Sequence, residues 1–217
     1  MSQDYQKPSV TVDILLLAAV NNTLTGLFIQ RKNPPFQGKW AIPGGFVDIN
    51  ESLENGAFRE LFEETHAKDI SLEQIYTFGD PKRDPRSRVI TVLYSAVLSA
   101  DELSIKADSD AAYTEWLPVN NLSNLAFDHR AILDFTLNRL KGKIASSPIL
   151  FQALPAQFSM DELQWIVRII LGDHDQVDQV IRSLLDLRVI QSTKDQNLYS
   201  FNESKLHWLS ERVFCLS

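Results

Sequence analysis

Residues 44–67 read GGFVDINESLENGAFRELFEETHA, and this stretch determines how the rest of the chain is interpreted. Its second half predicts a helix, for which Asn50 or Ser52 is available as the N-cap. Apolar residues recur at four-residue spacing on the face that suits a core: Leu53, Ala57 and Leu61. Gly44 and Gly45 end the preceding extended segment, and glycines at this point allow the backbone to pass close to a ligand.

Three carboxylates lie on the opposite face of the predicted helix. Glu60, Glu63 and Glu64 have i, i+3 and i+4 spacing, so they share one patch of surface and repel one another when no cation is present. Mg²⁺ is a hard ion that takes oxygen ligands and is often shared between a few carboxylates and substrate phosphates. Arg59 is expected to pair with Glu51 and so to hold the carboxylate face in one orientation. The sequence therefore predicts a divalent metal site on this helix.

The spacing of these residues resembles the Nudix box, in which a glycine, a glutamate, an Arg-Glu pair and a Glu-Glu pair recur at fixed offsets. The residues that match in register are Gly45, Glu51, Arg59, Glu60, Leu61, Glu63 and Glu64. His66 departs from the box, because the family has glycine there, and Ala67 replaces an aliphatic residue. A non-glycine residue costs on the order of 1 kcal/mol where a helix ends in the left-handed region, so the departure concerns the exit loop. A solvated acidic helix is the alternative, but it gives no reason for Gly45, Glu51 and Arg59 to fall at these offsets.

The resemblance implies a Mg²⁺-dependent hydrolase that cleaves a nucleoside diphosphate linked to another group, with Mn²⁺ as an alternative cofactor. The matching metal-ligand positions are Glu60, Glu63 and Glu64. The matching catalytic positions are Arg59, Glu63 and Glu64, with either glutamate as the base or its relay. Gly44 and Gly45 would lie against the substrate. The general base of this family often comes from a loop outside the box, and Asp84 and His129 are the two candidates for it.

Residues 79–88 read GDPKRDPRSR, a polar loop that concentrates positive charge in an otherwise acidic chain. Arginines suit bidentate contacts to pyrophosphate or ribose, so Arg83 and Arg86, with Asp84 between them, are predicted to bind substrate. A solvated loop is the alternative. The stretch RDPRSRVITVLY resembles a segment of Nudix enzymes and regulators that recognise ADP-ribose. ADP-ribose, hydrolysed to AMP and ribose 5-phosphate, is therefore the favoured substrate.

The segment LAFDH, residues 125–129, is also similar to a stretch of ADP-ribose-type Nudix domains. On that resemblance His129 would contact substrate or assist proton transfer, whereas a lone histidine more often has a capping or structural role. Asp128 is available to cap the helix expected over residues 130–140.

The order of the predicted elements indicates an α+β protein. Strands are expected over residues 11–20, 24–31, 41–42, 72–78, 89–98 and 111–119. The resemblance implies the Nudix fold, an α-β-α sandwich with a mixed sheet. A Lys-Gly-Lys helix end and a Ser-Ser-Pro linker predict a boundary between a Nudix domain, residues 1–145, and a second domain, residues 146–217.

The second domain follows a different pattern. Amphipathic helices over residues 160–171 and about 175–187, followed by a hairpin over 189–201, predict a winged helix-turn-helix. This order resembles Nudix-related transcriptional regulators of NAD metabolism, with Arg182 and Arg188 as candidate DNA contacts. Across this domain six cations face nine acidic residues, and a net charge of −3 opposes DNA binding. Dimerisation or shaping of the Nudix site is the alternative role, and a homodimer is expected.

The 217 residues carry a net charge of −7 and include one cysteine, Cys215. The acidic balance gives no general attraction for nucleic acid, so any phosphate-binding patch must be local. A single cysteine excludes an internal disulfide framework. The polar start and the short apolar run 14–20 predict neither a signal peptide nor a membrane span, so a cytoplasmic protein is expected.

The sequence leaves three functions open. The first is hydrolysis of a nucleoside diphosphate derivative, most of all ADP-ribose. The second is an ADP-ribose-responsive transcriptional regulator of NAD or sugar metabolism, although the complete set of box carboxylates argues against pure sensing. The third is hydrolysis of damaged nucleoside triphosphates.

Overall fold

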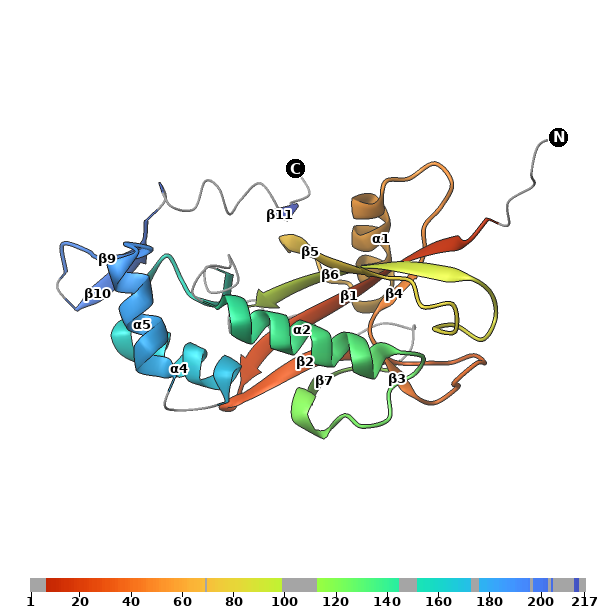
Figure 1. Ribbon diagram of the computed structural model, residues 1–217, viewed down its shortest axis with the longest axis horizontal. Coiled ribbons are helices and arrows are strands. Elements are labelled where there is room, and N and C mark those ends of the chain that lie inside the picture. Colours follow the sequence, from red (N-terminus) through yellow and green to blue (C-terminus); the bar gives the residue numbers. More distant parts are fainter. Residues whose placement is uncertain are drawn as a thin grey trace.

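The computed structural model of the protein is shown in Figure 1. The residues that it describes are 7–68, 70–98, 113–144, 152–172, 176–195, 197–202, 204 and 213–214. A large mixed sheet lies between two long helices, and a smaller group of helices and strands adjoins one end of it (Figure 1). The α+β fold with a mixed sheet that the sequence predicts is confirmed.

The large sheet contains eight strands in the order β11-β5-β6-β1-β2-β3, with β4 paired to β1 and β7 paired to β2. The strands are β1 (Ser9–Val20), β2 (Thr23–Gln30), β3 (Trp40–Ala41), β4 (Gly44–Phe46), β5 (Leu72–Phe78), β6 (Val89–Leu98), β7 (Thr114–Pro118) and β11 (Val213–Phe214). β1 and β6 pair in parallel, and the other pairs are antiparallel. The predicted strands 72–78 and 89–98 have these bounds in the structure, while the other predicted strands shift by one to three residues.

The central strand β1 supplies both layers of the core, because alternate side chains of a strand point to opposite faces. Ile14 and Leu16 belong to the cluster that contains Ala57 and Leu61 of helix α1 (Leu53–Thr65). Leu15 lies in the other cluster, with the buried side chains of helix α2 (His129–Lys143). The continuous apolar sequence of this strand therefore follows from burial on both sides.

Helix α1 is capped by a side chain at its start and by a backbone hydrogen bond at its end. Ser52 is the N-cap, and its hydroxyl accepts a hydrogen bond from the Asn55 N–H. His66 takes the left-handed conformation, with φ 57°, and its N–H donates to the Phe62 carbonyl. His66 therefore ends the helix as the glycine of the Nudix box would, at the conformational cost of a non-glycine residue.

Helix α2 begins without a side-chain cap, which corrects the role expected for Asp128. Asp128 is the N-cap residue, but its carboxylate makes no hydrogen bond to the helix backbone. It accepts hydrogen bonds from Arg83 instead, at 2.9 and 3.0 Å. A charge-assisted bidentate contact to a guanidinium is stronger than a bond to a neutral backbone amide, which explains the choice of partner.

The C-terminal part forms a second, three-stranded antiparallel sheet in the order β8-β10-β9. Its elements are β8 (Gln157–Ser159), α4 (Met160–Leu171), α5 (Val177–Asp186), β9 (Ile190–Ser192) and β10 (Leu198–Phe201). Ser159 and Glu162 form a capping box at the start of α4, and Gly172 ends the helix with φ 69°. The predicted helices and hairpin are therefore present in order, and β8 is an additional strand.

The C-terminal elements pack against the large sheet through a continuous apolar core. Ile166 of α4 belongs to the same buried cluster as Leu15 of β1 and Leu133 of α2. Trp165 also donates its indole N–H to the Asn22 side chain, at 2.6 Å, in the turn between β1 and β2. In the described part of the chain, no helix is long and apolar enough to cross a bilayer.

A shared core predicts cooperative unfolding. Ile166→Ala should lower the free energy of unfolding by about 2–5 kcal/mol, because it opens a cavity beneath both groups of elements. Urea denaturation followed by far-UV circular dichroism and by tryptophan fluorescence should give one transition at a shared, lowered midpoint. The exposed Arg168→Ala is the matched control and should change stability by no more than about 0.5 kcal/mol. Separate transitions for the two probes would contradict the shared core.

Candidate active site

The site is built where the backbone of Gly44 and Gly45 passes between β1 and α1. β4 pairs with β1 so that Gly44 lies opposite Asp13 and Gly45 opposite Val12. A Cβ atom on Gly44 would overlap the Val12 carbonyl oxygen and the Asp13 backbone, so glycine is required there. A Cβ atom on Gly45 would overlap only the end of the flexible Glu60 side chain, so glycine there allows the Glu60 carboxylate to lie against the backbone.

The glutamates of α1 differ in their surroundings. Glu64 accepts a hydrogen bond from the Gly44 N–H, at 2.8 Å. Burial is the main cause that raises the pKa of Glu64 to about 8, and the Gly44 hydrogen bond only partly opposes it. Burial also raises the pKa of Glu60, while the Glu63 side chain is 56% exposed. Burial thus outweighs the nearby positive charge at two of the three carboxylates, Arg59 beside Glu60 and Arg31 near Glu64.

Arg59 links the carboxylate face to the turn before the helix. Its guanidinium lies 2.6 Å from Glu51, 2.8 Å from Glu60 and 3.4 Å from Glu63, and it donates to the Phe46 carbonyl at 2.9 Å. The predicted Arg59–Glu51 pair is therefore present. The hydrogen bond from Arg59 is the main cause that lowers the pKa of Glu51. Arg59 holds the glutamates in place, but its contacts also occupy carboxylate oxygens that a cation would use as ligands.

The donor set fits Mg²⁺ in its chemistry. Carboxylate oxygens are the ligands that this ion prefers, and a nearby dication would favour the ionised form of Glu60 and Glu64, which burial disfavours. Among the described residues, no three or more Asp, Glu, His or Cys side chains converge on a point that could hold a metal ion. Metal binding at Glu60, Glu63 and Glu64 therefore stays a prediction and requires Arg59 to release part of the carboxylate face.

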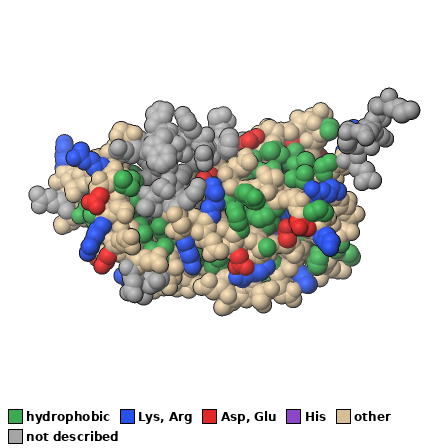
Figure 2. All heavy atoms as spheres, viewed as in Figure 1, with side chains coloured by type: hydrophobic (Ala, Val, Ile, Leu, Met, Phe, Trp, Pro, Cys, Tyr) green, Lys and Arg blue, Asp and Glu red, His purple; other side chains and the backbone are tan. Residues whose placement is uncertain are grey.

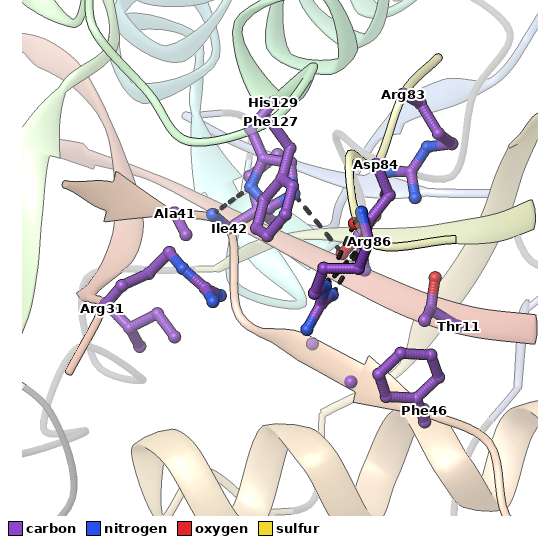
Figure 3. Close-up of a pocket in the computed structure, with 14 residues that line it drawn as sticks. Thr11, Arg31, Ala41, Ile42, Phe46, Arg83, Asp84, Arg86, Phe127 and His129 are labelled. Atoms are coloured by element: carbon purple, nitrogen blue, oxygen red, sulfur yellow. Dashed lines mark hydrogen bonds and ion pairs between the residues drawn. The ribbon is translucent and has the colours of Figure 1, made fainter. Parts of the chain in front are cut away.

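A cavity lies beside this glycine segment and is lined by β1, β4, the 79–88 loop and the residues before α2 (Figure 3). Of the residues predicted to bind substrate, all six line it: Gly44, Gly45, Arg83, Asp84, Arg86 and His129. The structure thus brings together residues that are up to 85 positions apart in the sequence. Their individual contacts to substrate stay predictions.

Arg83 and His129 belong to a buried polar network in the cavity wall. Arg83 contacts Asp128 at 2.9 Å and Asp13 at 3.3 Å, and its side chain is only 5% exposed. The Nδ1 atom of His129 accepts a hydrogen bond from the Ile42 N–H, at 2.9 Å. Burial lowers the pKa of His129, so the ring is neutral near pH 7. These contacts favour supporting roles for both residues.

Arg86 is the predicted residue that faces the cavity most openly. Its side chain is 42% exposed and pairs with Asp84 at 2.7 Å. Its guanidinium lies 5.4 Å from the ring centroids of both Phe46 and Phe127. Arg31, which sequence reasoning missed, lies 4.7 Å from the Phe127 ring centroid on the same cavity. The two arginines and Phe127 supply positive charge and a flat apolar surface together.

Asp13 was also missed, although the sequence carried a signal for it. It is a carboxylate within the continuous apolar strand TVDILLLAAV, and a buried charge needs a partner. No comparable signal marks Arg31, because its place in the cavity depends on the turn that follows β2. Local sequence reasoning therefore finds the carboxylate helix more readily than the opposite wall.

The fold and the site define a sandwich domain with a carboxylate helix beside a cationic cavity, an arrangement suited to ligands that carry phosphates. The chain belongs to the Nudix family, because the family model of the NUDIX domain matches residues 7–135. This match spans α1, the residues that line the cavity and the strands of the large sheet from β1 to β7, but not β11.

Two relatives of established name are similar to different extents of the chain. The ADPR responsive transcriptional repressor NtrR of Acinetobacter baylyi is 32% identical over 94% of this chain and 83% of its own length. The ADP-ribose pyrophosphatase of Methanocaldococcus jannaschii is 39% identical over 59% of this chain and 73% of its own length. The repressor therefore matches both groups of elements.

Solved structures likewise match either nearly the whole chain or about two thirds of it. A MutT/nudix family protein from Enterococcus faecalis has a TM-score of 0.78 at 29% identity, covering 93% of this chain and 89% of its own. Shewanella oneidensis NrtR in complex with a 27mer DNA has a TM-score of 0.73 at 30% identity, covering 96% and 99%. The NUDIX domain of that NrtR, in complex with ADP ribose, has a TM-score of 0.54 at 31% identity, covering 64% and 93%.

The raised pKa of Glu64 predicts how stability depends on pH. The folded, metal-free protein binds a proton at Glu64 up to a pKa of about 8, whereas an unfolded glutamate releases it near about 4.3. Stability should therefore fall as the pH rises through this window, because the folded state holds more protons than the unfolded state. Glu64→Gln should reduce this fall, as measured by Tm in EDTA across the window.

The exposed neighbour provides the control. Glu63→Gln should reduce the fall less than Glu64→Gln does, because it removes a carboxylate of the same helix whose side chain is 56% exposed. Mg²⁺ should restore Tm at the alkaline end for the unmodified protein and much less for Glu64→Gln. Equal slopes for Glu64→Gln and the unmodified protein would contradict the buried carboxylate.

Proposed function

We propose that the protein is a Mg²⁺-dependent Nudix hydrolase that cleaves ADP-ribose to AMP and ribose 5-phosphate. The observation that carries the proposal is the complete carboxylate face of α1, which adjoins a cavity with two arginines at its surface. The similarity to a named ADP-ribose pyrophosphatase over 59% of this chain supports the choice of substrate. Mn²⁺ is an alternative cofactor.

Different walls of the cavity would bind different parts of the substrate. Gly44 and Gly45 line the cavity, and their backbone lies against β1 and the Glu60 carboxylate, so a pyrophosphate bound beside them would lie next to the carboxylate helix. Arg31 and Arg86 offer positive charge for the phosphates, and the Phe127 ring offers a surface for a base. Arg83 holds Asp13 and Asp128 and thereby shapes the wall.

Glu60, Glu63 and Glu64 would hold the cation, and Arg59 would orient them. When bound, the cation neutralises the pyrophosphate and lowers the pKa of water to make a nucleophile. Glu64 is positioned by the Gly44 N–H, so its carboxylate faces the segment against which the phosphates would lie. Glu63 or Glu64 would accept the proton from the attacking water or relay it. Asp84 is held by Arg86, and His129 by Ile42, which makes both less suited to that role.

The decisive variant is Glu64→Gln, which keeps the shape of the side chain and removes its charge. Its turnover of ADP-ribose with Mg²⁺ should fall by about 10²-fold or more, the usual scale for loss of a preorganised catalytic group. Formation of AMP and ribose 5-phosphate measures the reaction. A variant that folds and keeps nearly full turnover would overturn the assignment.

A substrate panel separates hydrolysis of ADP-ribose from cleavage of damaged nucleoside triphosphates. ADP-ribose, other nucleoside diphosphate sugars and oxidised triphosphates should be compared with Mg²⁺ and with Mn²⁺. Preferred turnover of the triphosphates would replace the proposed substrate while leaving the metal-dependent chemistry in place.

A second candidate is an ADP-ribose-responsive transcriptional regulator of NAD or sugar metabolism. The match to NrtR in complex with DNA, over 96% of this chain, favours it. On this proposal, residues 1–145 form the nucleotide-binding domain and residues 146–217 form a winged helix that a homodimer presents twice to DNA. Hydrolysis and regulation are compatible, because a ligand shifts an equilibrium only through its different affinities for two states.

The charged residues on α5 and just after it are relevant to the DNA-binding proposal. Arg182 and Arg188 are exposed, as DNA contacts must be, but so are Asp178 and Asp186. On the face in Figure 2, positive and negative side chains are interspersed over the C-terminal elements. Phosphate backbones favour continuous positive charge, so binding by this helix would depend on few contacts.

The DNA-binding proposal can be tested with the upstream DNA of the protein's own gene and of neighbouring NAD-metabolism genes. Gel shifts at low salt, with and without ADP-ribose, should show a complex that ADP-ribose changes and that Arg182→Glu and Arg188→Glu weaken. Arg168→Glu on α4 is a charge-matched control. Absence of any shift at low salt would remove the regulator.

A further inference from the structure

Thr11 carries a buried hydroxyl in the wall of the cavity. The residue is 7% exposed, lies on β1 and lines the cavity with Asp13. Within the part of the chain that the structure describes, its Oγ1 atom has no hydrogen-bond partner. A buried polar group without a partner typically costs about 1–3 kcal/mol, so a ligand that supplies one gains binding energy there.

Thr91 provides an internal comparison. It is the parallel neighbour of Thr11 on β6 and is completely buried, and its hydroxyl also has no partner among the described residues. Thr91 does not line the cavity, whereas Thr11 does. The two threonines therefore have similar strand environments and differ in their access to a ligand.

The strand registers determine the order of groups along the cavity. In the β1–β4 ladder, Phe46 lies opposite Thr11 and Gly44 lies opposite Asp13. Arg31 and Phe127 lie beyond the glycines, in contact with each other. Figure 3 shows this order, with Arg31 at one side and with Thr11 and Phe46 at the other. The Gly44–Gly45 segment therefore lies between two ends of different chemistry.

The middle of the cavity is the place for the pyrophosphate, because the carboxylate helix adjoins Gly44 and Gly45 there. Both ends carry an aromatic ring near the Arg86 guanidinium, Phe46 and Phe127. The Phe127 ring also has Arg31 beside it, so the Phe127 end suits a planar base better. The Thr11 end offers a hydroxyl and, on the adjoining loop, the Asp84 carboxylate, whose side chain is 3% exposed. Hydroxyl and carboxylate oxygens suit a ligand rich in hydroxyl groups.

We propose that the Thr11 hydroxyl binds the terminal ribose of ADP-ribose and distinguishes a nucleoside diphosphate sugar from a simple nucleoside diphosphate. The inference rests on the proposed function and assigns one end of the same site. The Thr11 hydroxyl both donates and accepts, so it pairs with a sugar hydroxyl, while Asp84 adds an acceptor. A site built to bind a hydroxyl discriminates strongly against a ligand that lacks it, because its own buried polar group is then left unpaired.

The test compares Thr11→Val with Thr91→Val in the full chain. Calorimetric titrations with ADP-ribose and with ADP, in EDTA to prevent turnover, measure both affinities. Thr11→Val should weaken ADP-ribose binding about tenfold or more, the scale of one well-placed hydrogen bond, and leave ADP binding unchanged. Thr91→Val should leave both unchanged. Neither variant should lower Tm, because neither hydroxyl has a protein partner to lose among the described residues.

The outcomes separate the inference from the proposed function. If the unmodified protein binds ADP-ribose and Thr11→Val binds it equally well, the Thr11 contact is overturned while the substrate stands. Equal weakening of ADP-ribose and ADP by Thr11→Val would overturn the assignment to the terminal ribose. If the unmodified protein neither binds ADP-ribose in EDTA nor hydrolyses it with Mg²⁺, the proposed substrate and the ribose contact are overturned together.

Discussion

The backbone at Gly44 lies closer to β1 than a side chain would allow, and the backbone at Gly45 lies against the Glu60 carboxylate. A Cβ on Gly44 would meet the Val12 carbonyl, and a Cβ on Gly45 would meet the Glu60 carboxylate. This close approach brings β1 and α1 together. The Gly44 N–H then donates a hydrogen bond to Glu64 and so positions its carboxylate. The fold and the site therefore depend on the same close approach, since moving the helix away would separate its glutamates from the cavity.

The buried carboxylates of the site need positive charge beside them. Some of the arginines supply that charge, and others lie open to the cavity. Arg59 and Arg83 bind acidic side chains within the protein, at Glu51 and Asp128 among others. Such pairs are costly to break from one side, because a buried charge without its partner is strongly destabilising. Arg31 and Arg86 lie on the cavity against Phe127 and remain the better candidates for an anionic ligand.

Sequence reasoning succeeded where a pattern is local. The strands 72–78 and 89–98 and the carboxylate face of α1 follow from periodicity and spacing alone. It was less complete where partners are distant: Arg83 binds Asp13 and Asp128, 70 and 45 positions away, and no local signal identifies either pair. The three-residue strand β8 is too short to show a period. Tertiary contacts therefore decided which polar residues support the wall and which face the ligand.

Strand β2 connects the cavity to the C-terminal elements. It begins beside Asn22, which accepts the Trp165 hydrogen bond from α4, and it leads directly to Arg31 at the cavity. Leu24 at its start lies in the core shared with α4. A ligand that moves Arg31 thus acts on one end of an element whose other end carries the C-terminal helices. β2 is therefore a single element that contacts α4 at one end and leads to the cavity at the other.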